Sequence, residues 1–138
     1  MTLDLTPSSN SSTSIRAYRG QYQEIPITIY NSGGTKRNVS NDKIWFTVKS
    51  DPDTMLDSQA EIRKGSTSPD TGLTGITKAD STAGSVLVIL DGTDTDPMSP
   101  RSYSYDAKVM STSDSKPYVV MAGPFILQRQ TTRQPSGG

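Results

Sequence analysis

Short runs of alternating apolar and polar residues, each ended by turn-forming residues, are the feature that most restricts how this chain folds. The clearest run is Glu24 to Tyr30, in which Ile25, Ile27 and Ile29 occupy every second position. Successive side chains of a strand point to opposite faces, so this spacing predicts a half-buried β-strand. Pro26 has no backbone N–H, which places this strand at a sheet edge or a bulge.

Further segments follow the same pattern. In Lys43 to Lys49, alternate residues including Phe46 are expected to point inward, which leaves Trp45 on the opposite face. The almost continuously apolar run from Gly84 to Leu90 predicts a central strand covered on both faces. Residues 55–62 fit either a short helix or the start of a strand. The remaining predicted strands are 15–18, 73–77, 102–110, 118–121 and 125–128, the last two being separated by Gly123-Pro124.

The number and length of these runs indicate the fold class. Seven to nine short strands, without a long amphipathic helix, a heptad or an internal repeat, predict an all-β protein with a single two-sheet β-sandwich. A chain of 138 residues has room for one such domain. The serine- and threonine-rich start predicts an extended polar arm over residues 1–14. The sandwich is expected over 15–133, and a polar tail over 134–138.

The sequence contains no histidine and no cysteine. The Ser-His-Asp and Cys-His arrangements, an imidazole base and thiolate metal sites are therefore excluded. Carboxylates remain, but they fall in turn-like segments such as Asp51-Pro52-Asp53, where aspartate usually shapes the turn. The segment from Asp91 to Asp96 offers oxygen ligands for calcium, yet it lacks the EF-hand order, so we expect a hairpin-like connection there. We therefore expect no enzyme, no cofactor and no metal site.

Charge and hydropathy restrict the partners. Fourteen basic residues balance fourteen acidic ones, and no dense basic cluster occurs in the sequence. A chain with zero net charge gives no support for nucleic acid or an anionic membrane as a partner. The start of the chain lacks the features of a secretory signal, and no apolar run reaches the roughly 20 residues of a membrane span. We expect a soluble protein that is not exported by the usual signal.

The order of several short segments carries a family resemblance. Arg19-Gly20 precedes the alternating isoleucine strand and the Gly33-Gly34 turn. The later segments are Ile44 to Lys49, Asp51 to Asp53, Asp94-Thr95, Tyr103-Ser104-Tyr105-Asp106, Gly123-Pro124-Phe125 and Thr131-Thr132-Arg133. In this order, from about Ile15 to Arg133, the chain resembles the immunoglobulin-like β-sandwich domains of tailed-bacteriophage structural proteins, of the kind at the N-terminus of upper baseplate proteins. It departs from their pattern at Gln21, where an acidic residue is usual, and at Arg101, where a glycine is expected.

The resemblance implies a structural virion protein of a tailed bacteriophage. Such a protein is a non-catalytic assembly module, either a capsid cement (decoration) protein or a tail or baseplate adaptor. It is made in the host cytoplasm and incorporated into the virion. The implied partners are the major capsid protein or tail and baseplate proteins, together with further copies of the chain.

Three residues are candidates for partner binding. We expect Leu3 and Leu5, the apolar side chains of the arm, to lie along an adjacent subunit. Trp45 is the candidate exposed anchor of the sandwich, because it faces away from Phe46. The alternative is a carbohydrate- or cell-surface-binding β-sandwich module. A sugar-binding surface would normally present two or three exposed aromatic residues in a row, whereas Trp45 stands alone in the predicted pattern.

Overall fold

The computed structural model describes residues 14–31, 33–51, 60–67, 71–112 and 116–129, and in these ranges it is almost entirely β. The eight strands are β1 (Ile15–Tyr18), β2 (Gln23–Thr28), β3 (Asp42–Lys49), β4 (Ile62–Ser66), β5 (Gly75–Asp80), β6 (Ser85–Leu90), β7 (Arg101–Ser111) and β8 (Pro117–Gln128). Two short helical segments accompany them, the 3₁₀ turn η2 (Ser81–Ala83) and α1 (Gly92–Thr95). The all-β prediction is confirmed.

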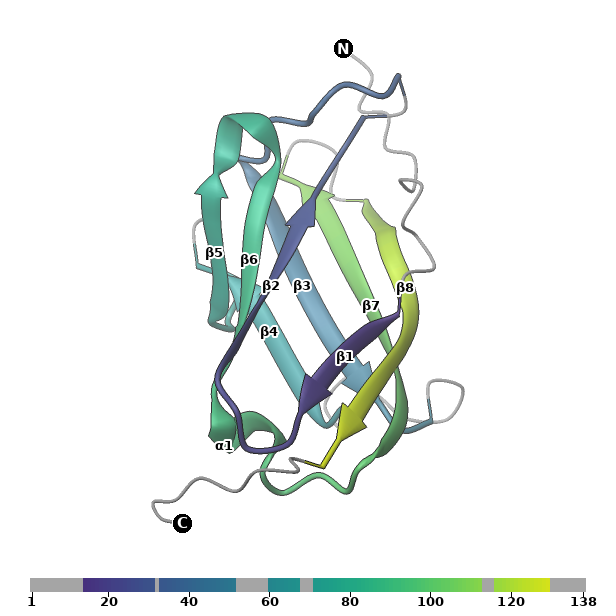
Figure 1. Cartoon of the computed structure of the whole chain (residues 1–138). Helices are drawn as coiled ribbons and strands as arrows, with labels where there is room; N and C mark the ends of the chain where they lie inside the picture. The colour runs from purple at the N-terminus through teal and green to yellow at the C-terminus, as the bar shows by residue number, and fades with distance from the viewer. Residues whose placement is uncertain (1–13, 32, 52–59, 68–70, 113–115, 130–138) are drawn as a thin grey trace.

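The strands form one hydrogen-bonded series that folds over on itself. Their order is β1-β8-β7-β3-β4-β5-β6-β2. The junction of β4 with β5 is parallel and only two residue pairs long, Gly65 with Gly75 and Ser66 with Ile76. This weak junction divides the series into a layer of β5, β6 and β2 and a layer of β4, β3, β7, β8 and β1 (Figure 1). The two layers form the predicted immunoglobulin-like sandwich.

Side chains protect the edges of the two end strands of the series, β1 and β2. Pro26 lies in β2, which pairs only with β6, so the prediction that this proline marks an edge strand is confirmed. Gln23 Nε2 donates a hydrogen bond of 2.9 Å to the backbone oxygen of Arg16 in β1. An exposed strand edge is a template for unwanted pairing, and both a proline and a bonded side chain oppose such pairing.

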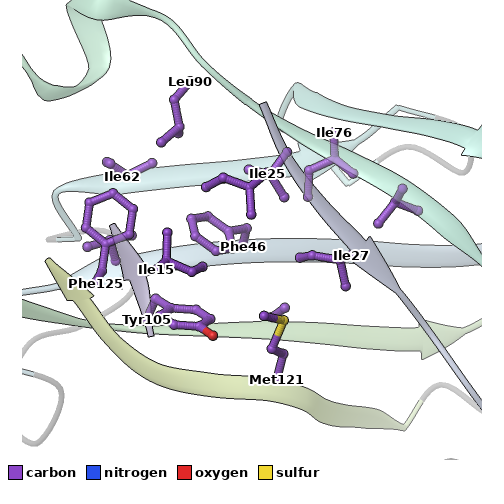
Figure 2. Packing of buried hydrophobic residues seen from close by; sticks show 14 of the residues in the cluster. Ile15, Ile25, Ile27, Phe46, Ile62, Ile76, Leu90, Tyr105, Met121 and Phe125 are labelled. Carbon is purple, nitrogen blue, oxygen red and sulfur yellow. The ribbon is translucent and has the colours of Figure 1, made fainter. Parts of the chain in front are cut away.

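The core lies between the two layers and is centred on Phe46 of β3, which is fully buried (Figure 2). The ring of Phe46 stacks on Tyr105 of β7 with 5.5 Å between the centroids, and meets the ring of Phe125 of β8 edge-on at 6.4 Å. Ile25 and Ile27 of β2 contribute to the same cluster from the opposite layer. Burial raises the pKa of Tyr105 to about 12, so its hydroxyl stays protonated even at a pH near 10.

A charged pair is buried beside this core. Arg37 Nε and Nη2 donate to the two carboxylate oxygens of Asp42 at 2.7 and 3.1 Å, and Arg37 Nη1 donates to Asn31 Oδ1 at 3.1 Å. Both side chains are less than a tenth exposed. Gly84 allows the chain to close here, because its φ is +68° and a Cβ would collide with the backbone oxygen of Ile29. The bidentate geometry satisfies both charges and fixes the connection between β2 and β3.

Three predictions about individual strands are wrong. The segment that forms β6 is not covered on both faces, because Val86, Val88 and Leu90 are buried whereas Leu87 and Ile89 are partly exposed. β8 runs unbroken through Gly123-Pro124, since β1 pairs with it only from Phe125 onward and a proline is tolerated where a strand has one neighbour. The strand predicted at 73–77 is β5, which begins at Gly75 and continues to Asp80.

The ambiguous segment 55–62 lies mostly outside the described residues. Its last residue, Ile62, begins β4, which agrees with the strand alternative at that position. The predicted arm (1–14) and tail (134–138) also lie outside, except for Ser14.

Replacing Phe46 with alanine should lower the free energy of unfolding by about 3–5 kcal/mol, because the change removes a fully buried ring that contacts two others. The matched control is Tyr18→Ala; Tyr18 is 44% exposed, so this change should cost much less than the loss of the buried Phe46 ring. Urea unfolding followed by Trp45 fluorescence measures both. Equal losses for the two variants would show that Phe46 is not the centre of the core.

Candidate interaction surface

Trp45 lies on the outward face of the second layer, as the alternation in β3 predicted. Its neighbours across the sheet are Gly65 of β4 and Lys108 of β7. Along β3, buried and partly exposed residues alternate without exception, so Trp45 is half-buried while its neighbours Ile44 and Phe46 are in the core. The tryptophan ring therefore contributes to the surface and is not required to fill the core.

The absence of a side chain at Gly65 shapes the surface beside Trp45. A Cβ at Gly65 would collide with the side chain of Thr71 and lie 2.9 Å from the Cβ of Leu73. Thr71 Oγ1 donates to the backbone oxygen of Ser66 at 2.6 Å, which holds the segment down on β4. Leu73 is thereby placed on the same face of the sheet as Trp45.

These residues line a hollow with a volume of about 350 Å³, which we call the Trp45 hollow. It is lined by Trp45, Thr47, Arg63, Leu73, Lys108, Met110 and Pro117. Among the described residues, the lining combines four apolar side chains with two cations and contains no carboxylate. Within the described part of the chain, the side chains of Arg63 and Lys108 make no ion pair. Such a hollow suits a ligand with an apolar or aromatic group and a negative charge.

The hollow belongs to a basic sheet face that the sequence did not reveal. Lys43 and Lys49 of β3 lie on the same face as Arg63 and Lys108, together with the acidic residues Asp106 of β7 and Glu61 before β4. These cations are separated by up to 65 positions along the chain, so no cluster is visible in the sequence. Strand pairing alone brings them together.

At one end of the sandwich, Arg19-Gly20 packs against α1. The backbone N–H of Gly20 donates to Thr95 Oγ1 at 2.9 Å, and Arg19 Nε donates to the backbone oxygen of Asp96 at 2.9 Å. A Cβ on Gly92 would lie 2.5 Å from the backbone oxygen of Gly20. Two of the segments that carried the family resemblance, Arg19-Gly20 and Asp94-Thr95, are thus in direct contact.

The segment from Asp91 to Asp96 contains α1, so the predicted hairpin-like connection is wrong. Asp91 and Asp94 form a reciprocal capping box at the start of the helix. Asp94 Oδ2 accepts from the backbone N–H of Asp91 at 2.8 Å and from Lys64 Nζ at 2.7 Å. The carboxylate of Asp94 is therefore occupied by local structural contacts. Among the described residues, no group of three or more acidic side chains is arranged to hold a metal ion.

A second exposed surface lies beside α1, and we call it the Tyr22 end; it consists of Tyr22, Glu24, Asp91 and Asp96. The Tyr22 side chain is 54% exposed, and its hydroxyl donates to Glu24 Oε2 at 2.8 Å. This hydrogen bond raises the pKa of Tyr22, and partial desolvation and the charges of Glu24 and Asp91 raise it further. The sequence pattern did not predict this surface.

Of the three sequence-predicted binding residues, the structure places one. Trp45 lies in the hollow described above, whereas Leu3 and Leu5 are outside the described residues. The hollow surrounds Trp45 with cations and aliphatic side chains, and no second aromatic side chain from the described ranges lines it. The helical segments in the described ranges are too short and too polar to cross a membrane.

Comparison with known proteins gives likeness in structure only. No family model matches the sequence, and no curated protein matches it. The structure is similar to the N-terminal domain of phage TP901-1 ORF48, with a TM-score of 0.54 and 8% identity over 91% of this chain and 94% of that domain. It is also similar to the natural killer cell receptor NKp44, with a TM-score of 0.50 and 18% identity over 86% of this chain and 98% of the receptor chain. The fold is thus one shared with a phage protein domain and with an NK cell receptor.

The contact between α1 and Arg19-Gly20 should depend on the missing side chain of Gly92. Gly92→Ala should lower the free energy of unfolding by about 1–3 kcal/mol, because the new methyl group would push the backbone of Gly20 away from α1. Helix propensity alone would favour alanine by about 1 kcal/mol. A lower free energy of unfolding would therefore have to come from the collision with Gly20. Gly33→Ala is the control, since a Cβ there meets nothing within 4 Å. Thermal unfolding compares the two, and a neutral Gly92 variant would contradict the close packing.

Proposed function

We propose that this chain is a non-catalytic structural part of a tailed-phage particle. The observation that carries the proposal is the likeness to the N-terminal domain of phage TP901-1 ORF48, which covers more than nine tenths of both chains. Matching over the full length means that the whole sandwich, and not one motif, has a counterpart in a phage protein. The segments Arg19-Gly20 and Asp94-Thr95, on which the sequence resemblance was built, also meet in space.

The roles of the polar side chains support a structural function. Asp42 is occupied by Arg37, and Asp94 is occupied by Lys64 and the cap of α1. A pair of catalytic carboxylates has to face a substrate across a cleft, and these two are committed to separate contacts within the fold. The chain contains no histidine to replace them. The partners in this role are other virion proteins and further copies of the chain, as part of the capsid surface, the tail or the baseplate.

A second function, recognition of a carbohydrate or a cell surface, is favoured by one observation. Trp45 lies in a hollow beside Arg63 and Lys108, an arrangement that fits an acidic sugar, and a receptor shares the fold. A glycan array distinguishes the two functions, because selective binding that Trp45→Ala abolishes would support the second. The fold by itself does not choose between them, since one sandwich serves many functions.

The virion role is tested by immunogold electron microscopy of purified particles of the phage that encodes the chain. An antibody raised against residues 15–129 should label every particle at a fixed location. The location of the label assigns the protein to head, tail or baseplate. An antibody against a non-structural protein of the same phage is the control. Unlabelled particles would overturn the proposal if mass spectrometry of their denatured proteins also finds no peptide of this chain.

The arm is tested by deletion. Removing residues 1–12 should abolish incorporation into particles while leaving thermal unfolding of the purified chain unchanged, because Leu3 and Leu5 are proposed to lie on an adjacent subunit. Replacing both leucines with serine should have the same effect, whereas Thr2→Ser with Thr6→Ser should not. Normal incorporation of the truncated chain would exclude this role for the arm.

A further inference from the structure

The Trp45 hollow and the Tyr22 end are opposite in charge on a chain whose net charge is zero. The hollow presents Arg63 and Lys108 around an apolar floor. The Tyr22 end presents an exposed aromatic ring beside the carboxylates of Glu24 and Asp91, and the exposed Asp96 lies near Asp91 and Gly20. The two surfaces therefore carry opposite charges, and each also has an apolar or aromatic group that can pack against the other.

Arg19 does not cancel the negative charge of the Tyr22 end. Arg19 Nη2 lies 4.0 Å from Asp96 Oδ1, and the two side chains are 45% and 71% exposed. A pair this long and this hydrated interacts weakly, so the Asp96 carboxylate is accessible to another cation. Glu24 and Asp91 leave the end with an excess of acid.

The two surfaces lie on different parts of the molecule. The Tyr22 end is at the tip of the sandwich, where the β1–β2 connection meets α1 (Figure 1). The Trp45 hollow is on the outward face of β3, β4 and β7. A contact between them therefore joins two copies through two unlike surfaces, which is a head-to-tail contact that continues into a ring or a filament.

We propose that the Trp45 hollow receives Tyr22 of a second copy of this chain, with Glu24 and Asp96 of that copy facing Arg63 and Lys108. The inference deepens the proposed assembly function and rests on it. A tyrosine anchored in a pocket and surrounded by paired charges is the usual composition of an interface centre. The volume of about 350 Å³ is sufficient for one aromatic side chain.

The charges at this contact make it sensitive to salt. Raising the salt concentration from about 0.1 M to about 1 M shortens the Debye length from about 10 Å to about 3 Å. Sedimentation velocity of the full chain at concentrations up to about 1 mM, the range where weak contacts form, should show dimers and longer oligomers that disappear at high salt. A wild-type chain that remains monomeric throughout overturns the proposal.

Charge reversal identifies the two surfaces. Lys108→Glu and Asp96→Lys should each reduce self-association at least tenfold, and Trp45→Ala should do the same through the lost floor of the hollow. The controls are Lys36→Glu and Asp80→Lys, which make the same charge changes at exposed positions outside both surfaces and should associate like the wild type. Circular dichroism confirms that every variant is folded. Equal effects at the control positions would contradict the assignment.

Mixing the two reversed variants gives the sharpest test. The acidic end of the Lys108→Glu variant fits the unchanged hollow of the Asp96→Lys variant, and the two reversed surfaces also fit each other. Oligomers should therefore reappear in the mixture, and failure to reappear overturns the contact. This outcome is independent of the particle labelling: a monomeric chain that labels particles rejects only the head-to-tail contact, and an associating chain absent from particles rejects only the virion role.

Discussion

The contact of Phe46 with Tyr105 and Phe125 is the interaction on which the rest of the structure depends. It joins β3, β7 and β8 at the centre of one layer, and Ile25 and Ile27 of the other layer belong to the same buried cluster. Because side chains alternate along a strand, fixing Phe46 inward also fixes Trp45 outward. The alternation along β3 therefore determines both which face packs in the core and which face carries the Trp45 hollow.

Polar contacts close the sandwich where apolar residues are scarce. Hydrophobic residues make up only 31% of the chain, so the core extends little beyond the strands. The bidentate Arg37–Asp42 pair fixes the β2–β3 connection, and Thr95 with the cap of α1 fixes the connection between β1 and β2. Such contacts hold a defined geometry rather than supply a large net stability, because desolvation offsets much of the attraction. Asp42 and Asp94 serve this purpose, because Asp42 pairs with Arg37 and Asp94 binds Lys64 and caps α1.

Because a phage domain and a receptor chain share this fold, the fold alone does not determine what the chain binds, and its surface has to be considered. The two proteins share with this chain an arrangement of strands, at identities of 8% and 18%. On this chain the described surface carries a basic hollow on one sheet face and an acidic tyrosine surface at the tip. Both surfaces lie outside the buried core, and a shared fold does not determine which surface binds a partner.

The alternation of residues along the chain predicted the strands, the inward Phe46, the outward Trp45 and the edge position of Pro26, because burial on one face imposes a period of two on the sequence. The same local pattern could not determine how far β8 continues past Pro124, since that depends on where β1 begins to pair. It also could not show that Asp94 caps a helix and binds Lys64, a residue 30 positions away. The sequence by itself determined the fold class, whereas the tertiary structure alone decided the surfaces. Strand periodicity is local, but a surface is assembled from strands whose neighbours are set by pairing across the whole chain.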